Sequence, residues 1–325
     1  MTVDSIQKVA IVGTTGRIGG VFAEALVQTG KHTVTGLTRQ GSHGQQPDGV
    51  RHVEVDYDDE ASIVDALRGQ QFLVITLGVY VPEEVHHRIA VAAGKAGVPY
   101  IMPNIFGYPV LEHAKKDEQG LNNVVHARVD HVRSNGVSSS IRLPCGFWYE
   151  WSLATGEQWF GFTIKSRKVT FFDDGRRTLT VSTWDQCGRA LAALLSFPES
   201  GASPSVADFK NQDLLIYSFR VSQRDMLDSL HRVLGTTDDD WEITYESVEK
   251  RIADGDKEIA KGIRTGRPKA LYGRAFRTDN ATADFADTMS TANEVLGLPT
   301  EDLDEATRRT VQMVEDGWNP LGLAV

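Results

Sequence analysis

Residues 8–20, KVAIVGTTGRIGG, most strongly constrain the fold of this chain. An apolar run ends there at Gly13, and two further glycines follow at intervals of three residues. Residues 9–12 are apolar enough for a strand buried on both faces, and residues 18–28 have helical spacing. Gly13 permits a sharp exit from the strand, because glycine adopts backbone angles that other residues avoid. The pattern predicts a strand, a tight turn and a helix in direct succession.

A turn of this kind is suited to a dinucleotide. Gly16 leaves room for a pyrophosphate beside the backbone, and Gly19 lets the helix pack closely on the strand. The helix N-terminus adds free N–H groups and the positive end of its dipole. The alternative is a glycine turn that connects a strand to a helix and binds nothing. The spacing G-x-x-G-x-x-G is typical of short-chain and extended reductases.

Strands and helices alternate as far as residue 143. The apolar patterns predict further strands at residues 32–37, 50–55, 72–77, 100–102 and 138–143, and helices at residues 61–67, 84–96 and 123–134. Strands that alternate with helices at this spacing form a parallel sheet with both faces covered. We therefore expect an α/β fold, a Rossmann-type doubly wound parallel sheet.

The pattern changes beyond Cys145, where aromatic residues become dense. We expect strands at residues 168–172 and 178–182, as a hairpin or as two short strands around a turn, and further strands at 214–219 and 241–245. Helices are predicted at residues 185–195, 223–234, 248–261 and 301–317. This indicates a nucleotide-binding domain over residues 1–150. A smaller α+β substrate-binding region over residues 151–325 would be partly interleaved with it.

Composition excludes several classes of protein. The chain has 325 residues, of which 41% are hydrophobic and 24% charged, and no apolar run approaches the ~20 residues that a membrane span needs. A net charge of −10 argues against nucleic acid as a partner. The basic run at residues 165–168 is either a local patch or a solvated turn. The sequence leaves a homodimer or a protein partner open.

The cysteines and histidines point to neither a disulfide framework nor a metal. Cys145 and Cys187 are the only cysteines, and residues 1–8 lack a basic segment followed by an apolar stretch, so we expect a cytoplasmic protein. His86, His87 and His113 have no partners at metal-ligand spacing.

The end of the second predicted strand indicates which dinucleotide would bind. Thr38 and Arg39 stand there, no acidic residue follows until Asp48, and Arg17 in the glycine turn is a second cation. A carboxylate at this point favours NAD(H), whereas a 2′-phosphate needs a cation, so the sequence predicts NADP(H). Arg39 could instead only solvate the strand end. Asp56 is predicted to close the adenine end of the site, to cap the next helix, or both.

Several segments together resemble a known family. AIVGTTGRIGG, TVTGLTRQ and VEVDYDDEASIVDALRG leading into FLVITLG resemble the NmrA-like and isoflavone-reductase-like branch of the atypical short-chain dehydrogenases/reductases. IMPNIFGYP is similar to the Pro-Ser-Glu-Phe-Gly segment of isoflavone and phenylcoumaran benzylic ether reductases. HARVDHVRSNGVSSSIRLPCGFWYEW is similar to their following helix, strand and aromatic loop. The resemblance is good over residues 3–155 and loose beyond them.

The resemblance implies a set of site residues. Those at the phosphates would be Gly13, Thr15, Gly16, Arg17, Ile18 and Gly19, with Thr38 and Arg39 at the 2′-phosphate. The nicotinamide half would pass Leu77, Gly78 and Val79 and the loop that holds Pro103, Asn104 and Phe106. Aromatic residues predicted to contact the substrate are Tyr80, Phe106, Tyr108, Phe147, Tyr149 and Trp151.

The chain departs from the family at the proton donor. The family's reductases carry a lysine at the start of the helix after the nicotinamide loop, and His126 stands there in this chain. Asn104 replaces the family's serine, Ile105 replaces its glutamate, and no Tyr-x-x-x-Lys pair is present. An imidazole exchanges protons near neutral pH, so His126 is the predicted general acid. The alternative is a polar helix residue without a proton to move, with a tyrosine in reserve.

The sequence is compatible with three functions. The first is an NADP(H)-dependent reductase that reduces a C=C or C=O bond of a small aromatic or polyketide-like metabolite. The aromatic stretch at residues 147–162 would then form an apolar pocket, or else an ordinary core. The second is a regulator that senses NADP(H) without turnover, as the resemblance to NmrA implies. The third is a cyclase or isomerase that reuses the cofactor cleft.

Overall fold

The computed structural model describes residues 5–42, 44–78, 81–110 and 121–321. The chain divides into two compact units, which we treat separately. Unit 1 comprises Met1–Pro144, Trp184–Ile216 and Thr291–Leu298, and unit 2 comprises Cys145–Thr183, Tyr217–Ser290 and Pro299–Val325.

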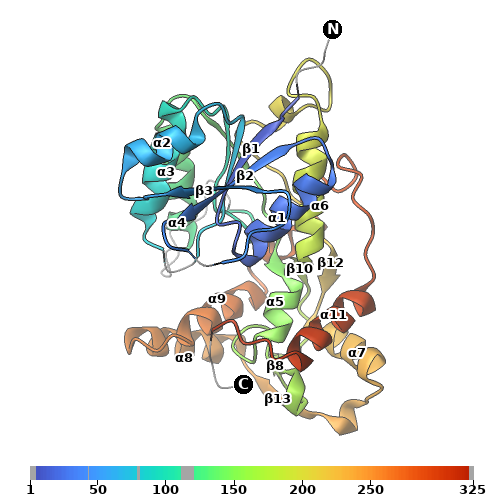
Figure 1. Ribbon diagram of the computed structural model, residues 1–325. Coiled ribbons are helices and arrows are strands. Elements are labelled where there is room, and N and C mark those ends of the chain that lie inside the picture. The colour runs from blue at the N-terminus through green and yellow to red at the C-terminus, as the bar shows by residue number, and fades with distance from the viewer. Residues whose placement is uncertain (1–4, 43, 79–80, 111–120, 322–325) are drawn as a thin grey trace. The chain divides into compact units, whose positions relative to one another are not determined.

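Unit 1 is built on a seven-stranded sheet with the order β11-β6-β5-β4-β1-β2-β3, in which every neighbouring pair is parallel (Figure 1). Its strands are β1 (Lys8–Val12), β2 (Thr33–Arg39), β3 (Arg51–Val55), β4 (Phe72–Ile75), β5 (Tyr100–Met102), β6 (Ser139–Arg142) and β11 (Gln212–Asp213). The order 3-2-1-4-5-6 is that of a Rossmann fold. The predicted doubly wound parallel sheet is confirmed.

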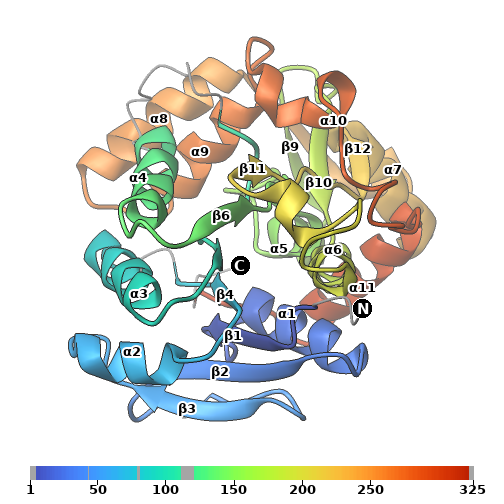
Figure 2. The same ribbon diagram turned by 90° about the horizontal axis from the view of Figure 1, so that it is seen from above.

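Helices cover both faces of this sheet. They are α1 (Arg17–Gln28), α2 (Glu60–Leu67), α3 (Glu83–Lys95), α4 (Leu121–Arg133) and α6 (Trp184–Ser196), together with the short η2 (Val206–Phe209). Figure 2 shows α2, α3 and α4 on one side of the sheet and α1 with α6 on the other. All four residues of β4 are buried, as are the last four of β1, because a strand between two helical layers exposes neither face.

Unit 2 contains two three-stranded sheets, ordered β12-β10-β7 and β13-β9-β8. The strands are β7 (Phe147–Trp148), β8 (Phe162–Thr163), β9 (Lys168–Phe172), β10 (Leu179–Ser182), β12 (Phe219–Val221) and β13 (Glu242–Glu246). The helices are α5 (Tyr149–Ala154), α7 (Gln223–Leu234), α8 (Val248–Ala260), α9 (Gly266–Phe276), α10 (Phe285–Thr288) and α11 (Leu303–Glu315), with η1 (Ile164–Ser166), η3 (Asp238–Asp240) and η4 (Ala281–Asp284).

Two predictions for this half of the chain need correction, and one helix was not predicted. The two short strands predicted around the DDGRR turn are confirmed as β9 and β10, but the alternative of a hairpin is wrong, because β9 pairs with β8 and β13 while β10 pairs with β7 and β12. A strand over residues 214–219 is wrong: the chain leaves the first unit after Ile216, and β12 begins only at Phe219. Helix α9 was missed. Gly255 and Gly266 bring α8 and α9 together, since a Cβ on Gly255 would lie 2.7 Å from the Ala270 nitrogen.

Within the described ranges, no helix combines the length and the apolar character that crossing a membrane requires.

Candidate functional site

The glycine turn between β1 and α1 is closed on one side and open on the other. Gly13 has a φ of 87°, and a Cβ there would lie 2.3 Å from the carbonyl oxygen of Thr76. A Cβ on Gly19 would lie 2.2 Å from the Gly13 oxygen, so both positions require glycine. Gly16 is exposed, and its Cβ would meet only the Gly13 oxygen, at 3.2 Å. The open side at Gly16 is where a phosphate can approach.

Helix α1 begins at Arg17 without a side-chain cap and without an acidic residue in its first turn. Its first N–H groups have no intrahelical acceptor, so an anion at this end would satisfy them. Thr15 is exposed beside the turn, whereas Ile18 is 8% exposed and anchors the helix in the core. The main chain of Ile18, and not its side chain, can therefore face a ligand.

Of the two residues at the end of β2, Thr38 is buried and hydrogen-bonded, whereas Arg39 is exposed. The hydroxyl of Thr38 lies 2.5 Å from Nε2 of His52, and Thr38 is buried. Arg39 is exposed at the last position of the strand, where its guanidinium is accessible from solvent.

Asp56 follows β3 and is exposed. Its carboxylate accepts a hydrogen bond from the backbone of Asp58 at 2.9 Å. The predicted cap of α2 at this residue is wrong, because Asp59 is the cap and accepts from the backbone of Ala61. Asp56 thus orders its own turn, and its side chain stays open to solvent.

The segment after β2 folds back over the glycine turn, which the sequence did not reveal. The hydroxyl of Thr14 donates to Oε1 of Gln46 at 2.5 Å. A Cβ on Gly44 would lie 2.5 Å from Cβ of Thr15, so only glycine fits at this crossing. The residues predicted to bind the phosphates are therefore held together from two directions, by Thr76 beneath and by this segment above.

A polar network fixes the loop after β5. Nδ2 of Asn104 donates to the carbonyl oxygen of Leu77 at 2.9 Å, and a guanidinium N–H of Arg128 donates to the carbonyl oxygen of Asn104. Arg128 also donates two hydrogen bonds to the carboxylate of Glu83, at 3.0 and 2.5 Å. The ends of β4 and β5 are thereby tied to α3 and α4. Pro103 is buried and Gly78 is exposed at this edge of the sheet, while Val79 and Tyr80 lie outside the described residues.

Arg128 is the member of α4 that faces this loop, and it was not among the site residues predicted from the sequence. His126 is half-buried and lies two positions earlier, which is about 200° around a helix. The two side chains therefore leave α4 in nearly opposite directions. The available signal was an arginine in register with Val124, Val125 and Val132, at the three- and four-residue spacing of a buried face.

Three histidines pack beside Arg128. His86 is fully buried on α3, its Nδ1 lies 3.2 Å from Nδ1 of His131, and the rings of His87 and His131 are 4.7 Å apart. Burial lowers the pKa of His86 to about 3, and the charge of Arg128 and the neighbouring histidines act in the same direction. Burial also lowers the pKa of His131. In the part of the chain described, no three His, Cys, Asp or Glu side chains are arranged to hold a metal ion.

The predicted substrate-binding aromatic residues have different environments. In unit 1, Phe106 packs against Phe22 of α1 with ring centroids 5.6 Å apart, and Tyr108 is half-buried. Both belong to the loop that follows β5, the loop that Arg128 holds.

In unit 2, Phe147 stacks on Tyr272 at 3.9 Å, and Trp151 meets Trp318 edge to face at 5.8 Å. Tyr149 is fully buried, with its hydroxyl 2.6 Å from that of Thr307, and burial raises its pKa. Phe147 and Trp151 are half-buried, whereas Tyr149 belongs to the core of unit 2.

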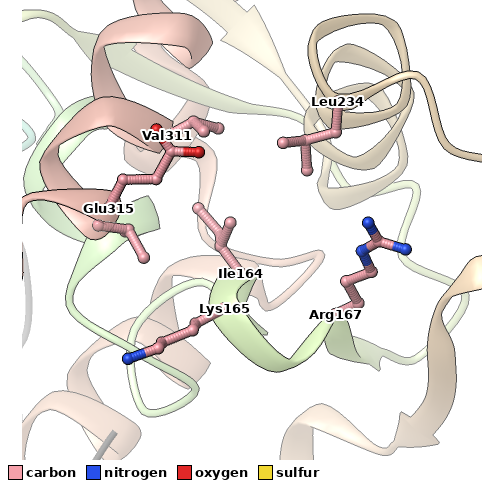
Figure 3. A pocket seen from close by; sticks show the side chains of 7 residues that line it. Ile164, Lys165, Arg167, Leu234, Val311 and Glu315 are labelled. Atoms are coloured by element: carbon pink, nitrogen blue, oxygen red, sulfur yellow. The ribbon is translucent and has the colours of Figure 1, made fainter.

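A hollow of about 240 Å³ also lies within unit 2 (Figure 3). It is lined by Ile164, Lys165, Arg167, Leu234, Val311, Val314 and Glu315. None of the aromatic residues predicted to contact a substrate is among them. The basic run at residues 165–168 thus stands at the edge of an apolar depression, and Lys168 pairs with Glu242.

Comparison with known proteins agrees with this architecture. Residues 5–142, which carry the glycine turn and the loop after β5, match the model of the NmrA-like family. The predicted resemblance to that family is confirmed over this segment.

A protein named oxidoreductase aprR from Aspergillus flavus is 27% identical over 92% of this chain and 96% of its own length. The crystal structure of an isoflavone reductase has a TM-score of 0.69 at 18% identity and covers 95% of this chain and 99% of its own. The structure of AtPrR2 with NADP+ and (+)pinoresinol has a TM-score of 0.73 at 19% identity, over 95% and 100% of the two chains. This chain has the fold of those reductases.

Proposed function

We propose that this protein is an NADP(H)-dependent reductase. The observation that carries the proposal is the glycine turn, closed at Gly13 and Gly19 and open at Gly16, with an exposed Arg39 at the end of the adjacent strand. The open turn matches a pyrophosphate, and the arginine matches a 2′-phosphate. Two further findings support it: aprR is named an oxidoreductase, and AtPrR2 shares the fold and holds NADP+.

The chain's own residues would hold the cofactor as follows. The backbone of the glycine turn and the N-terminus of α1 bind the phosphates, and Arg39 binds the 2′-phosphate. The network from Glu83 through Arg128 to Asn104 keeps the loop after β5 in place at the carboxyl end of the sheet, beside Leu77. The nicotinamide, when bound, supplies the hydride.

The proton that completes the reduction comes from His126, a tyrosine or water. His126 and Arg128 leave α4 on different sides, so His126→Ala and Arg128→Met affect different steps under this proposal. His126→Ala lowers kcat at neutral pH if the imidazole is the acid, and leaves the dissociation constant of NADPH unchanged. An unchanged kcat with the natural substrate assigns the proton to water or to a tyrosine.

We propose a small aromatic or polyketide-like molecule as substrate, reduced at a C=C or C=O bond. In unit 1, Phe106 and Tyr108 of the loop after β5 offer half-buried aromatic surface for such a molecule. Isoflavone and pinoresinol, which appear in the names of proteins with this fold, are small aromatic molecules.

The test is oxidation of NADPH, followed at 340 nm, with a panel of enones, quinones and quinone methides. A reductase consumes NADPH in the presence of at least one of these compounds, and the product gains two hydrogens by mass spectrometry. A regulator of the NmrA type binds NADPH and turns over none of them. A cyclase or isomerase converts its substrate after the nucleotide has been stripped, which would refute the reductase assignment.

A further inference from the structure

Arg17, the first residue of α1, lies over an aromatic ring of another helix. Its guanidinium carbon is 5.1 Å from the ring centroid of Trp184, at the start of α6. Trp184 is 6% exposed, so its ring is fixed in the fold, while Arg17 is exposed. A guanidinium at this distance from an indole is held by the attraction between its charge and the electron-rich ring.

The helix packing beneath this contact fixes its geometry. Arg17 and Val21 are four residues apart on α1, and Trp184 and Gly188 are four residues apart on α6, so each pair shares one helix face. A Cβ on Gly188 would lie 2.9 Å from Cγ1 of Val21 and 3.2 Å from Cβ of Ala25. The two helices therefore touch one turn below the Arg17–Trp184 contact. Trp184 therefore stands on the face of α6 that packs against α1.

The contact also fixes the direction in which Arg17 points. Figure 2 shows α6 beside α1, on the side away from β2 and β3. Strand β2 carries Arg39 at its end, and β1 separates β2 from β4 in the sheet. Arg17 thus leans toward α6 and not toward the end of β2, and it stays at the N-terminus of α1, where the pyrophosphate would bind under the proposed function.

We propose that Arg17 and Arg39 bind different phosphates and that Trp184 is the positioning residue for Arg17. Arg17 pairs with the pyrophosphate, which NADH and NADPH share, and Arg39 alone distinguishes the two nucleotides. Trp184 holds the guanidinium at the open side of the turn before the nucleotide arrives. This inference rests on the proposed cofactor. It adds separate roles for Arg17 and Arg39, which the sequence did not distinguish.

The experiment measures the dissociation constants of NADPH and NADH for the full chain by isothermal titration calorimetry. Arg17→Gln raises the dissociation constants of NADPH and NADH by the same factor, about tenfold for the loss of one charge-assisted contact to phosphate. Arg39→Gln weakens NADPH by a similar factor and leaves NADH unchanged. Circular dichroism and the thermal midpoint confirm that each variant is folded.

Trp184→Leu and Trp184→Phe test the positioning role. Trp184→Leu raises the dissociation constants of both nucleotides by the same factor. Trp184→Phe, which keeps an aromatic face, raises them less. The double variant Arg17→Gln/Trp184→Leu binds no more weakly than Arg17→Gln alone, because Trp184 acts through the arginine. A merely structural role for the tryptophan would instead add its effect to that of the arginine.

The outcomes separate this inference from the proposed function. If wild-type protein binds neither nucleotide, the proposed function fails and the inference fails with it. If wild-type protein binds NADPH but Arg17→Gln changes the NADPH-to-NADH ratio as Arg39→Gln does, the division of roles is wrong and the proposed function stands. Additive effects in the double variant, or full affinity in Trp184→Leu, overturn the role of Trp184 alone.

Discussion

Acidification should destabilise unit 1 through His86, whose imidazole is buried beside Arg128 and His131. Its pKa in the folded protein is about 3, below the value of 6.5 expected for an unfolded chain. The unfolded state therefore binds the proton more readily. The contribution of His86 to stability is complete above pH 6.5 and is lost as the pH falls toward 3.

The size of this effect follows from the difference between the two pKa values. Integrating proton binding with these values gives a loss of about 2 kcal/mol between pH 7.5 and pH 5.0, rising to about 3 kcal/mol at pH 4. His131 and His32, whose pKa values burial also lowers, act in the same direction. On acidification, the wild-type protein should therefore lose more unfolding free energy than His86 alone accounts for.

The assay compares urea unfolding of wild type, His86→Leu and His86→Gln at pH 7.5 and pH 5.0. Both substitutions remove the titrating group, one with an apolar and one with a polar side chain, so that packing changes are separated from titration. In each variant the loss of unfolding free energy on acidification is smaller than in wild type by about 2 kcal/mol. An NMR titration that found His86 protonating near pH 6.5 in the folded protein would refute the reasoning.

Three further predictions concern other residues. Gly13→Ala places a Cβ 2.3 Å from the Thr76 oxygen at a φ of 87°, so it should abolish nucleotide binding and lower the free energy of unfolding by about 2 kcal/mol or more. Gly16→Ala is the control: it should weaken nucleotide binding and leave the thermal midpoint nearly unchanged. Arg128→Met should lower kcat/KM and the thermal midpoint together, since the loop after β5 loses its tie to α3 and α4, and an unchanged kcat/KM would contradict this role. Arg251 is fully buried, and its guanidinium lies 2.6 Å from a carboxylate oxygen of Glu157. Arg251→Met should therefore lower the free energy of unfolding of unit 2 by about 3 kcal/mol in a urea titration. A loss below about 1 kcal/mol would show that unit 2 does not need this ion pair for its stability.

Local patterns were sufficient for most of unit 1. The glycine spacing and the buried run at residues 9–12 predicted β1, the turn and α1. The predicted bounds of α7, residues 223–234, are confirmed, and in the structure Ser222 caps this helix and Gly235 ends it. These features depend on neighbours in the chain. The alternation of strands and helices then left a parallel doubly wound sheet as the consistent arrangement.

Unit 2 was less predictable, because its strands are short and pair with distant segments. Residues 168–172 and 178–182 have the pattern of a hairpin, yet each pairs elsewhere, β9 with residues about 74 positions later in the register. Local alternation cannot reveal which partner a strand finds, since the same apolar face can be buried against any of them.

The sequence by itself determined the glycine turn, the parallel sheet and the presence of Arg39 at the end of β2, because each depends on residue type and spacing along the chain. Only the tertiary structure decided where the side chains point. It directed Arg128 and not His126 toward Asn104, set Arg17 over Trp184, and buried Tyr149 against Thr307. A side chain's direction depends on which elements pack around its own, and that packing joins segments that are far apart in the chain.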